Sequence, residues 1–290
     1  MKTILLAIDY SKNAITALKY AQAFSKKMDA SLSAIHVFDY PTVLGTKVQE
    51  PLPHLEENTL KQKLSELEKF CKQHLGNNLE EMNLSFEVVE NKSVVNGIVS
   101  KADEINAFMI IAGMKGTSLL KELVMGNTTR QLINKAHCLV LAVPEDVNYN
   151  HIKTIVYATD FKADADIEVI KKISEIAKVF DATIKVVHIA TKKEYAGELQ
   201  MEQFKATLKK KVAYLKIEFK VLFSEDIFES LRIFLGDVGA DLVVMLEREN
   251  TGFLKKIFHQ DLVKKMEIYG KIPLISYNEN NFGIFHFLNL

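Results

Sequence analysis

The chain has 290 residues, of which 48% are hydrophobic and 26% charged, and its 37 basic and 37 acidic side chains give a formal net charge of zero. A neutral balance offers no overall attraction to nucleic acid or to an anionic membrane, so neither is expected as a partner. The apolar runs, such as residues 107–114, are far shorter than the roughly 20 residues that a membrane helix needs. The first residues enter a strand pattern directly, without the features of a secretory signal, so we expect a cytoplasmic location.

The sequence contains two cysteines, Cys71 and Cys138. They show neither a CxxC spacing nor an accompanying set of histidines, so the pattern favours neither a disulfide framework nor a zinc site. We expect each of them to be a buried small hydrophobic residue.

In the first half of the chain, short apolar and β-branched runs alternate with longer stretches of helical period. Strands are expected at residues 3–8, 31–38, 84–89, 108–112 and 139–143. Apolar residues at helical spacing from Ala14 to Phe24 predict the first helix, with Ser11 as its N-cap. Residues 55–75 predict a second helix, and the proline-containing loop before it is either a lid or a surface insertion. This alternation is typical of an α/β fold with five parallel strands.

The second half repeats the first. Residues 2–9 (KTILLAID) return as residues 153–160 (KTIVYATD), and residues 29–36 return as residues 181–188. Such a repeat predicts two tandem copies of one Rossmann-like domain, over residues 1–146 and 147–290, each large enough to bury its own core. The polar stretch between them, residues 144–150, is short. We therefore expect the copies to pack together as an internal pseudo-dimer, and whether the whole chain also forms a homodimer stays open.

A glycine motif distinguishes the first copy. It reads Gly113-x2-Gly116-x9-Gly126, begins at the end of an expected strand, and leads through Asn127, Thr128 and Thr129 into an expected helix. Glycines let backbone amides approach an anion, and a helix N-terminus supplies free N–H groups and a positive dipole. The two threonine hydroxyls and the Asn127 amide would add donors for phosphate oxygens. The alternative is a pair of tight turns without a ligand.

The second copy lacks this motif. At the aligned positions it reads Glu247, Asn250 and Gln260, followed by Asp261. Carboxylates at these positions would repel a phosphate, so we expect one nucleotide per chain, held by the first copy.

The order of these features closely resembles the universal stress protein family in its tandem form, with the fold of the adenine nucleotide hydrolases. In that family the motif G-x2-G-x9-G-(S/T) marks members that bind ATP. The resemblance implies that Ala7, Ile8 and Asp9 line the ribose and adenine side, that the backbone at Val37 meets the adenine edge, and that ATP, with Mg²⁺, is the ligand. It further implies that the phosphates are held by Gly113, Gly116, Gly126, Asn127 and Thr128. Asn127 stands where the family has Ser or Thr.

Several single residues allow two interpretations. Asp9 follows a strand, where ligands of open α/β sheets bind, but it could equally cap the next helix. His36 and His188 recur at strand ends without a nucleophile partner, so we expect them to be hydrogen-bonded structural residues. Lys115 and Lys121 in the glycine loop would help to neutralise phosphate charge.

The leading hypothesis is an ATP-binding regulatory module without catalytic residues and without a metal-ligand cluster, because the chain has neither a P-loop nor a GxGxxG motif after its first strand. One alternative is a weak ATPase or self-phosphorylating enzyme that uses Asp9 and the hydroxyls of Thr128 and Thr129. The other is a nucleotide-free interaction scaffold that works through the aromatic tail, residues 281–290.

Overall fold

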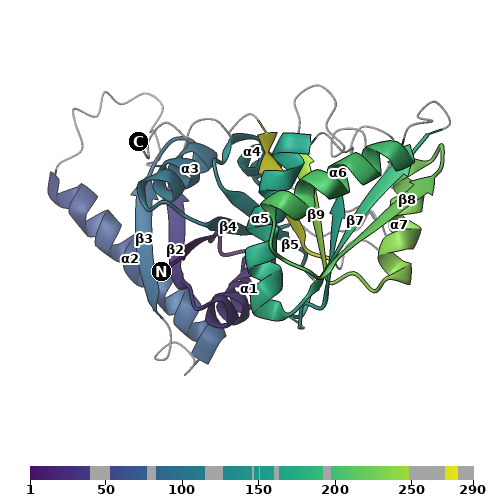
Figure 1. Cartoon of the computed structure of the whole chain (residues 1–290). Helices are drawn as coiled ribbons and strands as arrows, with labels where there is room; N and C mark the ends of the chain where they lie inside the picture. Colours follow the sequence, from purple (N-terminus) through teal and green to yellow (C-terminus); the bar gives the residue numbers. More distant parts are fainter. Residues whose placement is uncertain are drawn as a thin grey trace.

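The structure is a computed structural model that describes residues 1–39, 53–76, 83–114, 127–145, 147–149, 151–159, 163–191, 197–247 and 272–279. These residues form one ten-stranded sheet with helices on both faces (Figure 1). The strands of the first half are β1 (Thr3–Ala7), β2 (Ser31–Phe38), β3 (Leu84–Glu90), β4 (Met109–Gly113) and β5 (Leu139–Val143). Those of the second half are β6 (Thr154–Ala158), β7 (Thr183–Ala190), β8 (Ile217–Phe223), β9 (Leu242–Glu247) and β10 (Leu274–Asn278).

The strand order is β3-β2-β1-β4-β5-β10-β9-β6-β7-β8. Within each half all neighbouring strands are parallel, so the expected α/β class and the two five-stranded parallel halves are confirmed. At the centre β5 and β10 pair antiparallel, with Leu141 opposite Ile275. The two halves therefore share one continuous sheet, which is a closer association than the packing that the sequence predicted.

The helices cover both faces of this sheet. The helices of the first half are α1 (Lys12–Met28), α2 (Pro53–Leu75), α3 (Val94–Glu104) and α4 (Asn127–Lys135). Those of the second half are α5 (Ala163–Phe180), α6 (Gly197–Lys211) and α7 (Ile227–Asp237). One hydrophobic core lies under α1, α2, α5 and α6, and a second lies under α3, α4 and α7. Successive residues of β1 alternate between the two, with Ile4 and Leu6 in the first core and Leu5 in the second.

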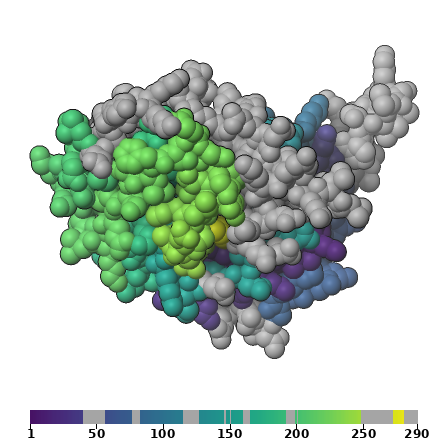
Figure 2. Space-filling view, turned by 90° about the vertical axis from the view of Figure 1, so that its right-hand side faces the viewer, coloured from purple at the N-terminus to yellow at the C-terminus, as the bar shows by residue number. Residues whose placement is uncertain are grey.

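Both cores extend across the two halves, which Figure 2 shows side by side, the first in purple and blue and the second in green. Polar contacts also cross the join. Lys2 forms an ion pair with Glu175 of α5, and the side chain of Asn278 in β10 donates to the Asn134 carbonyl of α4 at 2.6 Å. None of the described helices is long and apolar enough to cross a membrane.

The first helix has the cap that the sequence predicts. The Ser11 hydroxyl accepts a hydrogen bond from the Ala14 amide at 3.2 Å, and α1 ends at Asp29 in the left-handed conformation. The repeat extends to such details of the backbone. Asp29 and Asp181 have φ values of 49° and 56°, and Asn106 and Gly239 have φ values of 48° and 58°. The two copies thus keep the same turns although their side chains differ.

Candidate functional site

The strand order of the first half reverses between β1 and β4, since β2 and β3 lie on one side of this pair and β5 on the other. Ligands of open α/β sheets bind outside the carboxyl ends of the strands at this point. Ala7 ends β1, followed by Ile8 and Asp9, and Gly113 ends β4. The structure therefore brings these predicted site residues together at one edge of the sheet.

Gly113 is in close contact with the start of α1. A β-carbon built on it would lie 2.7 Å from both the carbonyl carbon and the oxygen of Asn13. Real β-carbons essentially never approach backbone atoms so closely. Glycine at this position is therefore required by the packing of α1 on β4, a role that the sequence motif did not reveal.

The start of α4 is held next to this glycine. Thr129 is 3% exposed, and its hydroxyl donates to the Gly113 carbonyl at 3.3 Å. The hydroxyl proton is thus used to bind β4, and the role of Thr129 as a phosphate donor stays a prediction. Thr128 and Asn127, one and two residues before Thr129, are exposed. They present their side chains to solvent at the N-terminus of α4.

Asp9 forms a turn just before the first helix, whose N-cap is Ser11. Its Oδ1 accepts a hydrogen bond from the Ser11 amide at 3.0 Å, while the side chain remains exposed. Among the described residues Oδ2 has no hydrogen-bond partner. Asp9 therefore supports the turn that leads to the Ser11 cap and is not itself the cap, and its second carboxylate oxygen remains available for a ribose hydroxyl or a cation.

Two histidines tie the ends of neighbouring strands together. Nδ1 of His36 bonds to the Ile8 carbonyl at 2.9 Å, and Nδ1 of His188 bonds to the Thr159 carbonyl at 2.8 Å. A carbonyl oxygen can only accept, so Nδ1 carries the proton in both rings. Both histidines are structural residues at strand ends, as the sequence predicted.

The backbone of Val37 faces the site. Ser31 donates its amide to the Lys2 carbonyl and Ile35 accepts from the Ile8 amide, so the odd-numbered residues of β2 direct their backbone groups toward β1. Val37 continues this alternation beyond the last residue of β1. Its side chain is 7% exposed and points into the second core, against Gly97 of α3.

Tyr10 is a residue of this region that sequence reasoning missed. It has a φ of 61°, and its ring lies 4.5 Å from that of His36 and 5.2 Å from that of Phe70, measured between centroids. Burial raises the pKa of its hydroxyl to about 12, and the carboxylate of Glu66 contributes in the same direction. Nothing in the sequence signals this left-handed conformation, because tyrosine has no preference for it.

The second half differs at the position of the first glycine. Ile4 pairs with Met109 in the first half and Ile155, its repeat equivalent, pairs with Leu242 in the second. Met109 and Leu242 therefore occupy equivalent positions, and so do Gly113 and Leu246, each four residues further along its strand. The alignment of Gly113 with Glu247, expected from the sequence, was wrong by one residue. Leu246 is 2% exposed and belongs to the core under α5. The second half thus has a buried side chain where the first has none.

Several predicted residues lie outside the described part of the chain. They are Gly116, Gly126, Lys115, Lys121, Asp160, Asn250, Gln260, Asp261 and the aromatic tail at residues 281–290.

Of the cysteines, Cys71 is buried as expected, whereas Cys138 is only half-buried. No group of three His, Cys, Asp or Glu side chains with the geometry of a metal site occurs among the described residues.

Comparisons with known proteins agree with this fold. The model of the universal stress protein family matches residues 1–144. Universal stress protein MJ0577 of Methanocaldococcus jannaschii is 28% identical over 152 residues, which is 49% of this chain and 94% of that protein.

Several solved structures cover nearly the whole chain, among them one from Archaeoglobus fulgidus and one from Pseudomonas aeruginosa. A universal stress protein from Archaeoglobus fulgidus has a TM-score of 0.69 at 13% identity and covers 95% of this chain and 98% of its own. A putative universal stress protein from Pseudomonas aeruginosa has a TM-score of 0.60 at 15% identity and covers 99% of this chain and 97% of its own. At these identities the likeness establishes the fold.

Proposed function

The chain belongs to the universal stress protein family, and from this premise we propose that its first half binds ATP as a nucleotide-sensing regulatory module without efficient catalysis. Within the family, one universal stress protein has been solved with cAMP and one from Archaeoglobus fulgidus with dAMP. Binding of cAMP and of dAMP is stated of those two proteins alone. The proposal for this chain rests on the geometry of its own residues.

The observation that carries the proposal is the exposed start of α4 beside the carboxyl end of β4. The Thr129 hydrogen bond to Gly113 fixes the helix N-terminus at the strand-order reversal, where α/β folds bind nucleotides. The first amides of a helix lack intrahelical partners and favour negative charge. Exposed Asn127 and Thr128 add side-chain donors. This edge is therefore suited to phosphate groups.

The adenosine part of a bound nucleotide would lie toward β1 and β2. The outward backbone groups of Val37 suit the hydrogen-bonding edge of adenine, and Oδ2 of Asp9 suits a ribose hydroxyl. Asp9 also fits Mg²⁺, which proteins usually bind through one or two carboxylates together with substrate phosphates. When bound, the ion would neutralise part of the phosphate charge.

Efficient catalysis is not expected because the described residues lack an activated nucleophile. The Thr129 hydroxyl is bound to Gly113, and His36 is bound to Ile8 through its protonated Nδ1. Thr128 has no base among the described side chains, and Oδ1 of Asp9 accepts a hydrogen bond from the Ser11 amide. The competing proposal of a weak ATPase or self-phosphorylating enzyme predicts sustained turnover. ATP hydrolysis at about 1 s⁻¹ or faster, within the ordinary range of enzymes, would favour that alternative.

Calorimetric titration of the full chain with ATP tests the phosphate assignment. Thr128→Glu places a carboxylate in the first turn of α4, where it is favourable for the helix but repels phosphate. We expect at least about a tenfold loss of ATP affinity, which corresponds to about 1.4 kcal/mol, with an unchanged melting temperature. Gln131→Glu adds the same charge about one turn further along α4 and should have a much smaller effect. Equal affinities for the parent and Thr128→Glu would contradict the proposal.

The nucleotide-free scaffold is distinguished by the ligand that accompanies the purified protein. Mass spectrometry of material released by denaturation should find an adenine nucleotide if the proposal is correct. Absence of any nucleotide, together with no binding in the titration, would favour the scaffold.

A further inference from the structure

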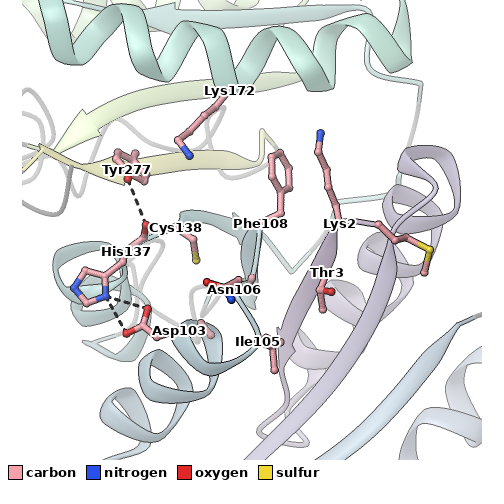
Figure 3. A pocket seen from close by; sticks show the side chains of 13 residues that line it. Lys2, Thr3, Asp103, Ile105, Asn106, Phe108, His137, Cys138, Lys172 and Tyr277 are labelled. Atoms are coloured by element: carbon pink, nitrogen blue, oxygen red, sulfur yellow. Dashed lines mark hydrogen bonds and ion pairs between the residues drawn. The ribbon is translucent and has the colours of Figure 1, made fainter. Parts of the chain in front are cut away.

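A pocket of about 460 Å³ lies at the edge of the sheet opposite the candidate nucleotide site (Figure 3). Its floor is formed where β1, β4 and β5 begin, with Thr3, Phe108 and Cys138 among the lining residues. Lys172 of α5 and Tyr277 of β10 cover it from the second half. Its volume lies within the range of small-molecule sites, about 300–1,000 Å³. Residues of both copies therefore line one cavity at their join.

Most charges around the pocket are already paired. Both carboxylate oxygens of Asp103 contact Nδ1 of His137, at 3.0 and 2.9 Å, and Lys2 forms its ion pair with Glu175. Lys172 differs from these residues. Its ammonium lies 5.6 Å from the centroid of the Tyr277 ring, and no carboxylate among the described residues forms an ion pair with it. Lys172 is therefore a half-buried cation on the pocket wall that is left for a ligand.

The remaining walls combine apolar surface with neutral polar groups. The ring of Phe108 lies between the two lysines in Figure 3, and the Nζ of Lys2 is 4.4 Å from its centroid. Asn106 and Cys138 lie on the wall below Lys172 and Tyr277. Burial raises the pKa of the Cys138 thiol to about 12, so at neutral pH no thiolate competes for the lysine. The Tyr277 hydroxyl donates to the His137 carbonyl at 3.3 Å.

We propose that this pocket binds a small organic carboxylate with an apolar body. The carboxylate contacts the Lys172 ammonium in a charge-assisted hydrogen bond, and the body lies along Phe108 and Ile105. The Lys172 ammonium, which has no carboxylate partner among the described residues, favours a negatively charged group and would repel an amine. A phosphate dianion would favour a second half-buried cation, and Lys2, the other lysine of the lining, is shared with Glu175. The site is independent of the proposed nucleotide site because the two lie at opposite edges of the sheet.

The test is calorimetric titration of the full chain with phenylacetate and hexanoate as probes. Phenylacetamide and phenethylamine serve as controls of matched shape that lack the negative charge. We expect binding of the two carboxylates and at least about tenfold weaker binding of the amide and the amine, since the charge-assisted contact is lost. Equal binding of phenylacetate and phenylacetamide would overturn the proposal. So would the absence of any carboxylate binding up to about 10 mM, a range that includes weak specific ligands.

Two neighbouring lysines of α5 provide a matched pair of variants. Lys172→Gln removes the charge that faces the pocket and should weaken phenylacetate binding at least about tenfold. Lys171→Gln removes the same charge from an exposed position of the same helix and should leave binding unchanged. Unchanged binding by Lys172→Gln would refute the assignment.

Discussion

The ring of Phe24 packs against the ring of Phe180 across the join between the two halves, with centroids 5.5 Å apart and planes inclined by 30°. Phe24 lies in α1 and is fully buried, and Phe180 is the last residue of α5. Tyr20 and Tyr149 extend this aromatic contact, with their ring centroids 5.3 Å apart. The two copies therefore share a core rather than only a surface.

From this shared core we predict that Phe24→Ala destabilises the whole chain. Deleting a buried phenylalanine ring costs about 3–5 kcal/mol because it removes contacts and leaves a cavity. The loss should appear in urea denaturation as one cooperative transition at lower urea, seen alike by circular dichroism and tyrosine fluorescence. Val179→Ala, at a 37% exposed position beside Phe180, should change the free energy of unfolding by less than about 0.5 kcal/mol. Two separate transitions in the parent protein would show that the halves unfold independently.

A second prediction concerns Gly113. The sequence alone suggests that Gly113→Val removes ATP binding with little effect on the fold, but the contact with Asn13 revises this expectation. Even Gly113→Ala should lower the free energy of unfolding by about 1–3 kcal/mol, because α1 must move away from β4. Gly236→Ala is the matched control. Its added β-carbon meets nothing within 4 Å in α7, so it should stabilise the protein by about 0.5–1 kcal/mol.

Thermal and urea denaturation of the two glycine variants provide the measurement. If Gly113→Ala is as stable as the parent, the close approach of α1 to β4 does not limit this position. Its loss of ATP binding could then be attributed to the site alone.

A third prediction is the binding of one nucleotide per chain. The first half has Gly113 at the end of β4, whereas the second half has the buried side chain of Leu246 at the same register position. Native mass spectrometry and calorimetry should therefore give one ATP per chain. Asp9→Asn keeps an acceptor for the Ser11 amide but removes the charge, and it should weaken ATP binding, while Asp160→Asn should not. Two equivalents of ATP per chain, or equal effects of the two substitutions, would disprove the asymmetry.

A fourth prediction is a loss of stability in alkaline solution. Burial raises the pKa values of Tyr10, Tyr149 and Tyr277 to about 12, above the ordinary value of 10.0. The folded state then keeps protons that the unfolded state has released. Their contribution to stability is fully present below about pH 10 and is lost as the pH rises toward 12. Urea titrations at a series of alkaline pH values measure this decline, and tyrosinate absorbance follows the titration.

Tyr10→Phe provides the internal comparison for that decline. The Tyr10 hydroxyl is buried without a hydrogen-bond partner among the described groups, while its ring contacts His36 and Phe70. The variant should keep the ring contacts, be at least as stable at pH 7, and lose less stability above pH 10. An identical alkaline decline in parent and variant would show that Tyr10 does not contribute to it.

The sequence by itself determined the elements and their repetition. Strands buried on both faces are continuous apolar runs, so the first-half strands such as residues 31–38 were found within a residue or two of their ends. Helix α1 and its Ser11 cap follow from residues close together in the sequence. The repeat of residues 2–9 predicted the second copy, and Asp9 after β1 and the glycine motif that begins at the end of β4 indicated the edge of the sheet where the candidate site is proposed.

Only the tertiary structure decided how these elements meet. The antiparallel pairing of β5 with β10, the approach of Asn13 to Gly113 and the bond from Thr129 to that glycine join residues far apart in the chain. The periodic spacing of apolar residues does not encode such contacts, because it indicates only which face of a helix or strand is buried. For the same reason the apolar residues of β9 could be aligned one position out of register. Strand pairing settled the choice, and with it the presence of Leu246 in place of the first glycine.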